Sequence, residues 1–313
     1  MALRQMRDTS GDKLAWFVML ATPLFFSTNL IFGRWTVPDV APATLAFLRW
    51  GAVALALSPF AVSEVRRQAV PWRLVLGLAC LGMVVCGAVV YLALGTTTAT
   101  NATLIYTTSP VFVLVIERLR GVPLSGRRAL GCVVAMIGVA VIVFRGEPSR
   151  VLSLELNVGD ALILLCAIAW AAYSIMFRDE RLAGIAPAGL FGLIAGVGAL
   201  TLAPFAALEW FGGAPMPLTA RAWTGLAGIV LFSSLIAFGG YQFGLRRFGP
   251  QTTSVFMYLL PAYGVLLAVG FLGERFEPFH AMGISLVLAG VVLATLPRPI
   301  VRRLGLSQDG WGW

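Results

Sequence analysis

The sequence predicts an all-α polytopic membrane protein with ten transmembrane helices, arranged as two inverted five-helix repeats. Of its 313 residues, 59% are hydrophobic and only 12% are charged, whereas a soluble globular chain carries roughly 25% charged residues. Almost the whole chain divides into apolar runs of about twenty residues, the length that crosses a bilayer as a helix. A third observation, residues that recur at fixed spacing between the two halves, predicts the duplication.

Short connections join the apolar runs, and none of them could hold a soluble domain. We predict spans at about 13–33, 41–61, 73–94, 98–117, 127–144, 158–178, 187–208, 222–245, 250–272 and 278–297. The first run is long enough to span and lacks a small-residue cleavage site after it, so we expect no cleavable signal peptide. The predicted parts are a cytoplasmic tail 1–12, a repeat 13–144, a linker 145–157, a repeat 158–297 and a cytoplasmic tail 298–313.

Residues of the first half recur in the second at an almost constant offset. Ala41-Pro42-Ala43 matches Ala186-Pro187-Ala188 at 145, Tyr91 matches Tyr241 at 150, Pro110 matches Pro261 at 151, and Gly131 and Gly138 match Gly283 and Gly290 at 152. Each repeat has an odd number of spans. The two copies should therefore cross the membrane in opposite senses, related by an axis in the membrane plane.

Basic residues give the predicted orientation. Seventeen of the 23 Lys and Arg residues lie at the termini or in the loops on the same side as the termini. This bias predicts that both termini are cytoplasmic. The formal net charge of +9 does not indicate a nucleic-acid partner, because the charges sit in short loops between apolar spans.

Two spans are unusually polar and contain a proline. In 98–117, a threonine- and asparagine-rich face precedes Pro110, and in 250–272 a second polar face precedes Pro261. Proline removes an amide donor and breaks or bends the helix. Paired, interrupted spans in corresponding halves point to a transport site, so we expect both to line a partly hydrated cavity enclosed by protein.

Several short motifs carry a resemblance to a known family. They are Ser27-Thr28-Asn29 before Gly33-Arg34, Leu48-Arg49-Trp50, the prolines Pro110 and Pro261, and Phe271-Leu272-Gly273-Glu274 followed by Gly283 and Gly290. Over residues 13–297 the chain resembles the drug/metabolite transporter superfamily in its EamA-type ten-helix form, and is most like the YddG-type amino-acid exporters of bacterial inner membranes. The family often has Leu-Gly-Glu after both central spans, whereas the first copy here has Gly121-Val122.

The resemblance implies a multi-pass secondary transporter of the bacterial inner membrane, and polar and aromatic residues of the inner spans are the candidates for binding its solute. They are Asn29, Arg49, Tyr91, Thr100, Asn101, Thr107, Trp170, Tyr173, Ser174, Tyr241, Gln251, Ser254 and Tyr258. A mostly apolar pocket with a few amides and hydroxyls suits a small amphipathic solute such as an amino acid. The alternative interpretation is helix packing by small residues and interfacial aromatic belts.

Arg49 is the one unambiguous charge well inside a span, and Ile194 occupies the matching position of the second repeat. An ionisable residue at such a depth is a functional hypothesis by default. Arg49 could hold a substrate carboxylate, or it could bond helix-end carbonyls or reach the interface.

Other chemistry is poorly supported. No Asp or Glu lies in the middle of a span, which argues against a carboxylate proton relay and favours facilitated efflux or exchange. His280 is the single histidine, the four cysteines lack metal-type spacing, and no phosphate-binding loop for ATP is present. We therefore expect no catalytic residues, no metal, no cofactor and no disulfide. The expected partners are a small-molecule substrate and the lipid bilayer, and a monomer is plausible.

The favoured function is export of amino acids, including aromatic or other apolar ones, or of related small metabolites by alternating access. Nucleobases, sugars or amphipathic drugs are the alternative solutes. A membrane-embedded lipid-modifying enzyme would need clustered His, Asp or Glu near one interface, which the sequence lacks. A passive pore is the third possibility, but inverted repeats with paired breaks favour alternating access.

Overall fold

The structure, a computed structural model, describes residues 9–36, 38–94, 96–97, 99–147, 149, 157–272 and 275–295. Most of both predicted tails, much of the linker, and the Gly273-Glu274 pair lie outside this part. The described elements are α1 (Thr9–Thr36), α2 (Pro42–Arg67), α3 (Trp72–Ala79), η1 (Cys80–Val89), α4 (Val90–Leu94), α5 (Ala99–Tyr106), α6 (Ser109–Leu119), α7 (Gly126–Val143), α9 (Val158–Met176), η2 (Glu180–Leu182), α10 (Pro187–Phe211), α11 (Ala220–Gly228), η3 (Ile229–Phe238), α12 (Gly239–Phe248), α13 (Pro250–Val255), η4 (Phe256–Tyr258), α14 (Leu259–Leu272) and α15 (Pro278–Thr295).

Nine of the described helical segments are long and apolar enough to cross a membrane. The helix α1, with 28 residues, completes the predicted set of ten. Four of the spans are composite: α3–η1–α4, α5–α6, α11–η3–α12 and α13–η4–α14. The all-α, ten-helix fold class predicted from hydropathy is confirmed.

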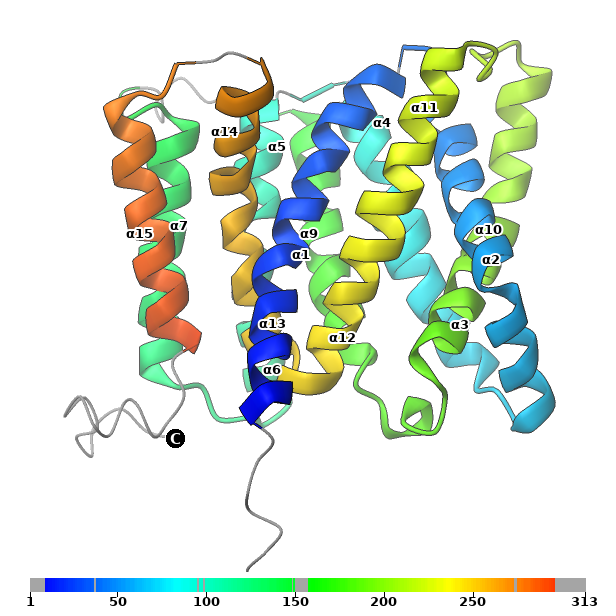
Figure 1. Cartoon of the computed structure of the whole chain (residues 1–313), viewed down its shortest axis with the longest axis horizontal. Coiled ribbons are helices and arrows are strands. Elements are labelled where there is room, and N and C mark those ends of the chain that lie inside the picture. Colours follow the sequence, from blue (N-terminus) through cyan, green and yellow to red (C-terminus); the bar gives the residue numbers. More distant parts are fainter. Residues whose placement is uncertain are drawn as a thin grey trace, which may run out of the picture.

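The spans stand side by side in one bundle (Figure 1). The pair α7 and α15 occupies one end of the bundle in this view, and α2 and α10 occupy the other. These two pairs also have the most extensive contacts between elements. The described chain enters the bundle at the lower end of α1 and leaves it at the lower end of α15, on the same side.

The two copies run in opposite directions. A Cβ on Gly131 would lie 2.7 Å from the Gly290 carbonyl oxygen, and one on Gly138 would lie 2.7 Å from that of Gly283. Residue numbers thus rise along α7 as they fall along α15, so these equivalent helices are antiparallel. Only glycine lets the two backbones approach this closely. The contact shows the inverted relation between the repeats.

Carboxylates at the ends of α2 and α10 show that these equivalent helices are also antiparallel. Glu209 accepts hydrogen bonds from the backbone N–H of Ala43 and Thr44 at 2.9 and 2.7 Å. Its counterpart at an offset of 145, Glu64, accepts from the backbone at Ala186. Each helix therefore has a carboxylate from its partner at its N-terminus, where unpaired amides and the helix dipole favour negative charge.

The third span of each repeat contains a ten-residue π-helix, η1 in the first and η3 in the second. The two begin at Cys80 and Ile229 and end at Val89 and Phe238, in corresponding positions. The two spans that contain Pro110 and Pro261 are also interrupted at corresponding positions. The first changes helix at Thr107 and Thr108 before Pro110, and the second passes through the 3₁₀ turn η4 before Pro261.

Candidate functional site

An aromatic cluster fills the centre of the bundle. It comprises six side chains, which are those of Phe26, Trp50, Trp170, Tyr173, Phe238 and Tyr241. They come from α1, α2, α9, η3 and α12, and their contacting ring centroids lie 4.7 to 6.3 Å apart. Both repeats contribute, so a change in how the repeats pack would rearrange these rings.

Two polar pairs fix the tyrosines of this cluster. The hydroxyls of Ser174 and Tyr241 lie 2.7 Å apart, and Gln242 donates from Nε2 to the Tyr173 hydroxyl at 2.7 Å. The structure thus brings together four of the predicted residues, Trp170, Tyr173, Ser174 and Tyr241. A buried hydroxyl needs a partner in an apolar interior, so these bonds orient the rings that face the centre.

Arg49 lies beside the aromatic cluster and is 5% exposed. Its Nε donates to the Ser234 hydroxyl at 2.7 Å, Nη2 to Ser233 at 3.3 Å and Nη1 to Tyr91 at 3.4 Å. The guanidinium also stacks on the Trp50 ring, 4.5 Å from its centroid. We call Arg49, Tyr91, Ser233 and Ser234 the arginine cluster.

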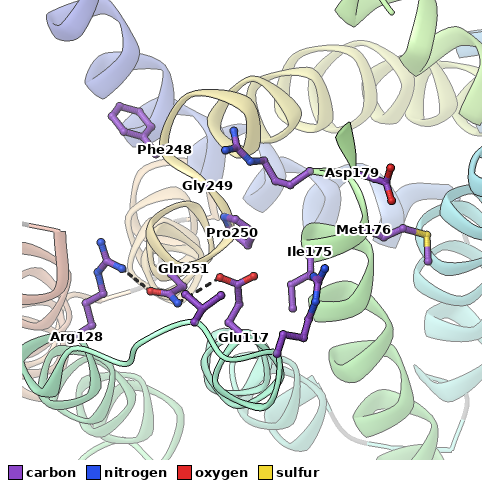
Figure 2. A pocket seen from close by; sticks show the side chains of 12 residues that line it. Glu117, Arg128, Ile175, Met176, Asp179, Phe248, Gly249, Pro250 and Gln251 are labelled. Carbon is purple, nitrogen blue, oxygen red and sulfur yellow. Dashed lines mark hydrogen bonds between the residues drawn. The ribbon is translucent and has the colours of Figure 1, made fainter. Parts of the chain in front are cut away.

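A cavity of about 490 Å³ opens at the lower end of the bundle. Figure 2 shows its wall, which includes the ends of α6, α9 and α12 and the start of α13. Arg128 donates from Nη1 to the Gln251 side-chain oxygen, and Gln251 donates from Nε2 to Glu117 at 3.3 Å. Gln251 therefore lies at the mouth of the bundle, connecting two charged groups, and not beside the central aromatic rings.

Charge of both signs surrounds this cavity. Arg120, Arg128 and Arg178 line it together with Glu117 and Asp179. A hydrogen bond from Arg181 is the main cause that lowers the pKa of the Asp179 carboxyl to about 2. Asp179 therefore stays negatively charged at neutral pH and is paired with Arg181.

At the opposite end of the bundle a polar network gathers around Asp160. Thr97 donates to one carboxylate oxygen, and Asn101 donates to the other at 3.2 Å. The backbone N–H of Asn157 also donates to Asp160 at 2.9 Å, which completes a capping box on α9. Asp160 thus caps its helix, as its position at a span end predicts. Asn101 connects α5 to α9 here and does not reach the central rings.

The remaining candidate residues lie inside the protein but contact one another less. The hydroxyls of Thr107 and Ser254 bond to carbonyls of their own helices. Asn29 Oδ1 is buried and has no hydrogen-bond partner in the described part of the chain, and the buried Tyr258 hydroxyl lies beside the Cys132 thiol. The side chain of Thr100 lies outside what the structure describes.

Sequence reasoning missed Ser233, Glu117 and Arg128 as members of polar clusters. Ser233 and Ser234 both lie in η3 and accept from different nitrogens of the Arg49 guanidinium. A signal was available, because two adjacent serines interrupt an otherwise apolar run. Within the described ranges, no three His, Cys, Asp or Glu side chains gather as metal ligands would.

Comparisons with known proteins place the chain among transporters. The sequence matches the profile of the EamA-like transporter family at residues 13–144 and 157–296, two segments that coincide closely with the repeats. It is 27% identical over 285 residues to an uncharacterized transporter of Archaeoglobus fulgidus, covering 89% of this chain and 96% of the relative. It is also 26% identical over 196 residues to the uncharacterized inner membrane transporter YedA of Escherichia coli, covering 62% and 61%.

A further relative has a named solute. The chain is 26% identical over 279 residues to a probable terminal-alkyne amino-acid exporter of Streptantibioticus cattleyicolor, covering 87% of this chain and 89% of the relative. Among solved structures, one crystal structure matches with a TM-score of 0.71 at 21% identity, covering 93% of this chain and 99% of that one. At this identity the likeness shows the fold alone.

Proposed function

Because this chain belongs to the EamA-like transporter family, we propose that it is a secondary transporter that exports amino acids or related small metabolites by alternating access. Aromatic or other apolar amino acids are the favoured solutes, as in the YddG-type exporters that the sequence resembles. The protein is a membrane transporter and not an enzyme. We propose the bacterial inner membrane as its location, with both termini in the cytoplasm.

One observation carries this proposal: the two antiparallel repeats meet at a buried aromatic and polar centre, with a polar network at one end of the bundle and a cavity at the other. The Asp160 network joins α5 to α9 at the upper end, and the cavity opens at the lower end. On the charge bias of the loops, the lower end is cytoplasmic. The arrangement then corresponds to a state that accepts solute from the cytoplasm before release outside.

The chemistry of the centre favours a small amphipathic solute. Six aromatic side chains offer apolar contact, and Asn29 offers a buried carbonyl oxygen that could accept from an ammonium group. A mostly apolar site with a few placed polar groups is typical of small-molecule pockets. The amino-acid exporter among the relatives supports the same class of solute. Nucleobases, sugars and amphipathic drugs are the alternative, since rings and amides also suit them.

Uptake into liposomes that contain the purified full-length protein tests the proposal. Labelled amino acids, nucleosides, sugars and cationic drugs would be offered one at a time, with protein-free liposomes as the control. We expect saturable uptake of apolar amino acids that unlabelled competitors inhibit. Uptake restricted to drugs or nucleosides would replace the amino-acid assignment, and unitary currents in planar bilayers would indicate a pore.

The energy source is tested in the same vesicles. The described spans have Asp160 in a closed hydrogen-bond network at a span end, and no acidic side chain lies in the aromatic cluster. We therefore propose facilitated efflux or exchange. Accumulation against a concentration gradient, driven by a proton gradient alone, would contradict this coupling.

A further inference from the structure

We propose that Arg49 is the recognition group for a carboxylate on the transported solute, so that the protein selects small monocarboxylates with an apolar or aromatic side chain. The inference rests on the proposed function and makes it more specific. It also gives the bound solute a direction, with the carboxylate at the arginine cluster and the side chain against the aromatic rings.

The first step is a surplus of hydrogen-bond donors. A guanidinium has five N–H groups and no acceptor, and its three partners in the structure are hydroxyls. Two of those contacts, at 3.3 and 3.4 Å, are longer than ordinary N–H···O bonds. Within the described residues the salt bridges involve other arginines, and Arg49 has no carboxylate partner.

A second buried donor lies next to the first. The Trp50 indole N–H is buried and finds no hydrogen-bond acceptor in the described chain. The same ring lies under the Arg49 guanidinium. A positive group and an unpaired N–H side by side attract an anionic acceptor, whereas a cationic solute would be repelled here.

The hydroxyl of Ser234 is oriented so that it accepts a hydrogen bond from Arg49. Ser234 donates its own hydrogen to the Ile229 carbonyl at 3.1 Å, so its lone pairs are presented to Arg49. The hydroxyls of Ser233 and Tyr91 make only the two long contacts. A carboxylate oxygen could replace these two without disturbing the short bond from Nε to Ser234.

The fold does not require this cluster, as the second copy shows. The contact between α2 and η3 recurs between α10 and η1. At the matching positions the chain has Ile194 for Arg49, and Val84 and Val85 for the two serines. Apolar side chains thus build the same packing elsewhere in the molecule. An arginine in the middle of a membrane costs about 2.5–3.5 kcal/mol to insert, so a purely structural role does not account for it.

Extension of the Arg49 side chain to the membrane–water interface does not explain this residue either. The residue lies seven positions after Pro42, the first residue of α2, about 10 Å along the helix axis. Its hydrogen bonds within the described chain go to hydroxyls on other helices of the interior, and none of these goes to a helix-end carbonyl. The ring under it contacts Phe238, with centroids 5.1 Å apart, which leads directly into the aromatic cluster.

Binding of matched acids and amides tests the proposal. Full-length protein in detergent would be titrated calorimetrically with L-phenylalanine, L-phenylalaninamide, 3-phenylpropionate and 3-phenylpropionamide. We expect the wild type to bind each acid at least about tenfold more tightly than its amide. In Arg49→Gln the affinity for the acids should fall by about 10- to 100-fold, the range of a lost charged hydrogen bond. The affinity for the amides should change by less than about twofold.

Two further variants control for folding and for general loss of charge. Arg49→Lys keeps the charge but not the forked geometry, and should retain an intermediate preference for acids. Arg127, another buried arginine, bonds the Leu293 carbonyl away from the cluster, so Arg127→Gln should leave the acid-to-amide ratio unchanged. Size-exclusion profiles would show that each variant is folded.

The outcomes separate this inference from the proposed function. Three outcomes would overturn the carboxylate site. They are equal affinities of the wild type for acid and amide, failure of both acids to bind, and an equal loss of affinity for acid and amide in Arg49→Gln. Arg49-dependent binding of 3-phenylpropionate, with no uptake of any amino acid into liposomes, would support the site and overturn amino-acid export.

Discussion

Close contact between α7 and α15 depends on single glycines. A Cβ placed on Gly131 would lie 2.6 Å from the Ala294 backbone nitrogen, and one on Gly290 would lie 2.4 Å from that of Ala135. Backbone atoms cannot move aside as a flexible side chain can. These positions therefore tolerate no side chain, and they hold the two repeats together at one end of the bundle.

Gly131→Ala and Gly290→Ala should each destabilise the protein by about 1–3 kcal/mol, the usual cost of overpacking. Thermal unfolding in detergent, followed by intrinsic fluorescence, would measure the change. Gly51→Ala is the matched control, because a Cβ there meets nothing within 4 Å and alanine favours the helix. A melting temperature for Gly131→Ala equal to that of Gly51→Ala would contradict the proposed packing role.

The sequence predicted which polar residues are buried better than it predicted the residues to which they bond. Polarity alone selected Asn101 and Gln251 as cavity-lining residues, and both are buried. The structure joins Asn101 to Asp160 and Gln251 to Glu117, because burial of an amide beside a charged group satisfies both. Sequence spacing cannot supply those pairs, which join residues 59 and 134 positions apart.

At the scale of elements, the interrupted spans are the parts that can change shape without unfolding. Pro110 is at the first turn of α6, where a missing amide hydrogen costs no bond. Pro261 follows the 3₁₀ turn η4. Both breaks lie inside the bundle, and we propose that they are hinges at which half-helices tilt when the repeats rearrange.

Replacing Pro110 and Pro261 with alanine should lower the uptake rate by about tenfold, equivalent to roughly 1.4 kcal/mol on the barrier, because continuous helices resist the tilt. Thermal stability should stay the same or rise, since alanine favours helix. Liposome uptake and melting temperature would be measured together. Pro204→Ala is the control, because Pro204 lies within the unbroken helix α10 and is exposed. Undiminished transport in the double variant would exclude a hinge role.

The spans and the duplication were accessible from the sequence, whereas the π-helices were not. Hydropathy places each span because burial in lipid needs about twenty apolar residues, and the recurring glycines and prolines reveal the repeat. No composition distinguishes η1 or η3 from an α-helix of the same length. η1 packs against α9 and η3 against α1, and such contacts are tertiary information that the sequence pattern does not contain.

For the whole molecule, the orientation in the membrane decides whether the cavity faces the cytoplasm, as the proposed export requires. The loops predict that the lower end, with the cavity, faces the cytoplasm. Met176 is half-buried in the cavity wall, and Thr96 is exposed at the other end. The two positions therefore report opposite sides of the membrane.

Single cysteines at these positions would test the orientation, with the native cysteines Cys80, Cys86, Cys132 and Cys166 replaced by alanine. We expect a membrane-impermeant maleimide to label Met176→Cys in inside-out vesicles, and Thr96→Cys in right-side-out cells. Cells opened with detergent serve as the control for full reactivity. The reverse pattern would place the cavity outside and change the proposed direction of transport.

The off-centre position of Arg49 has a kinetic consequence. If the halves were identical, a two-fold rotation would relate the outward- and inward-facing states, which would have equal free energies and equal half-saturation on both faces. Arg49 stands against Ile194 in the other copy, so this degeneracy is broken. Half-saturation should differ between the two faces, while the ratio of maximal rate to half-saturation stays equal for passive flux of a neutral solute, as detailed balance demands. The buried charge of Arg49 would thus contribute to different apparent affinities for the solute on the two faces of the membrane.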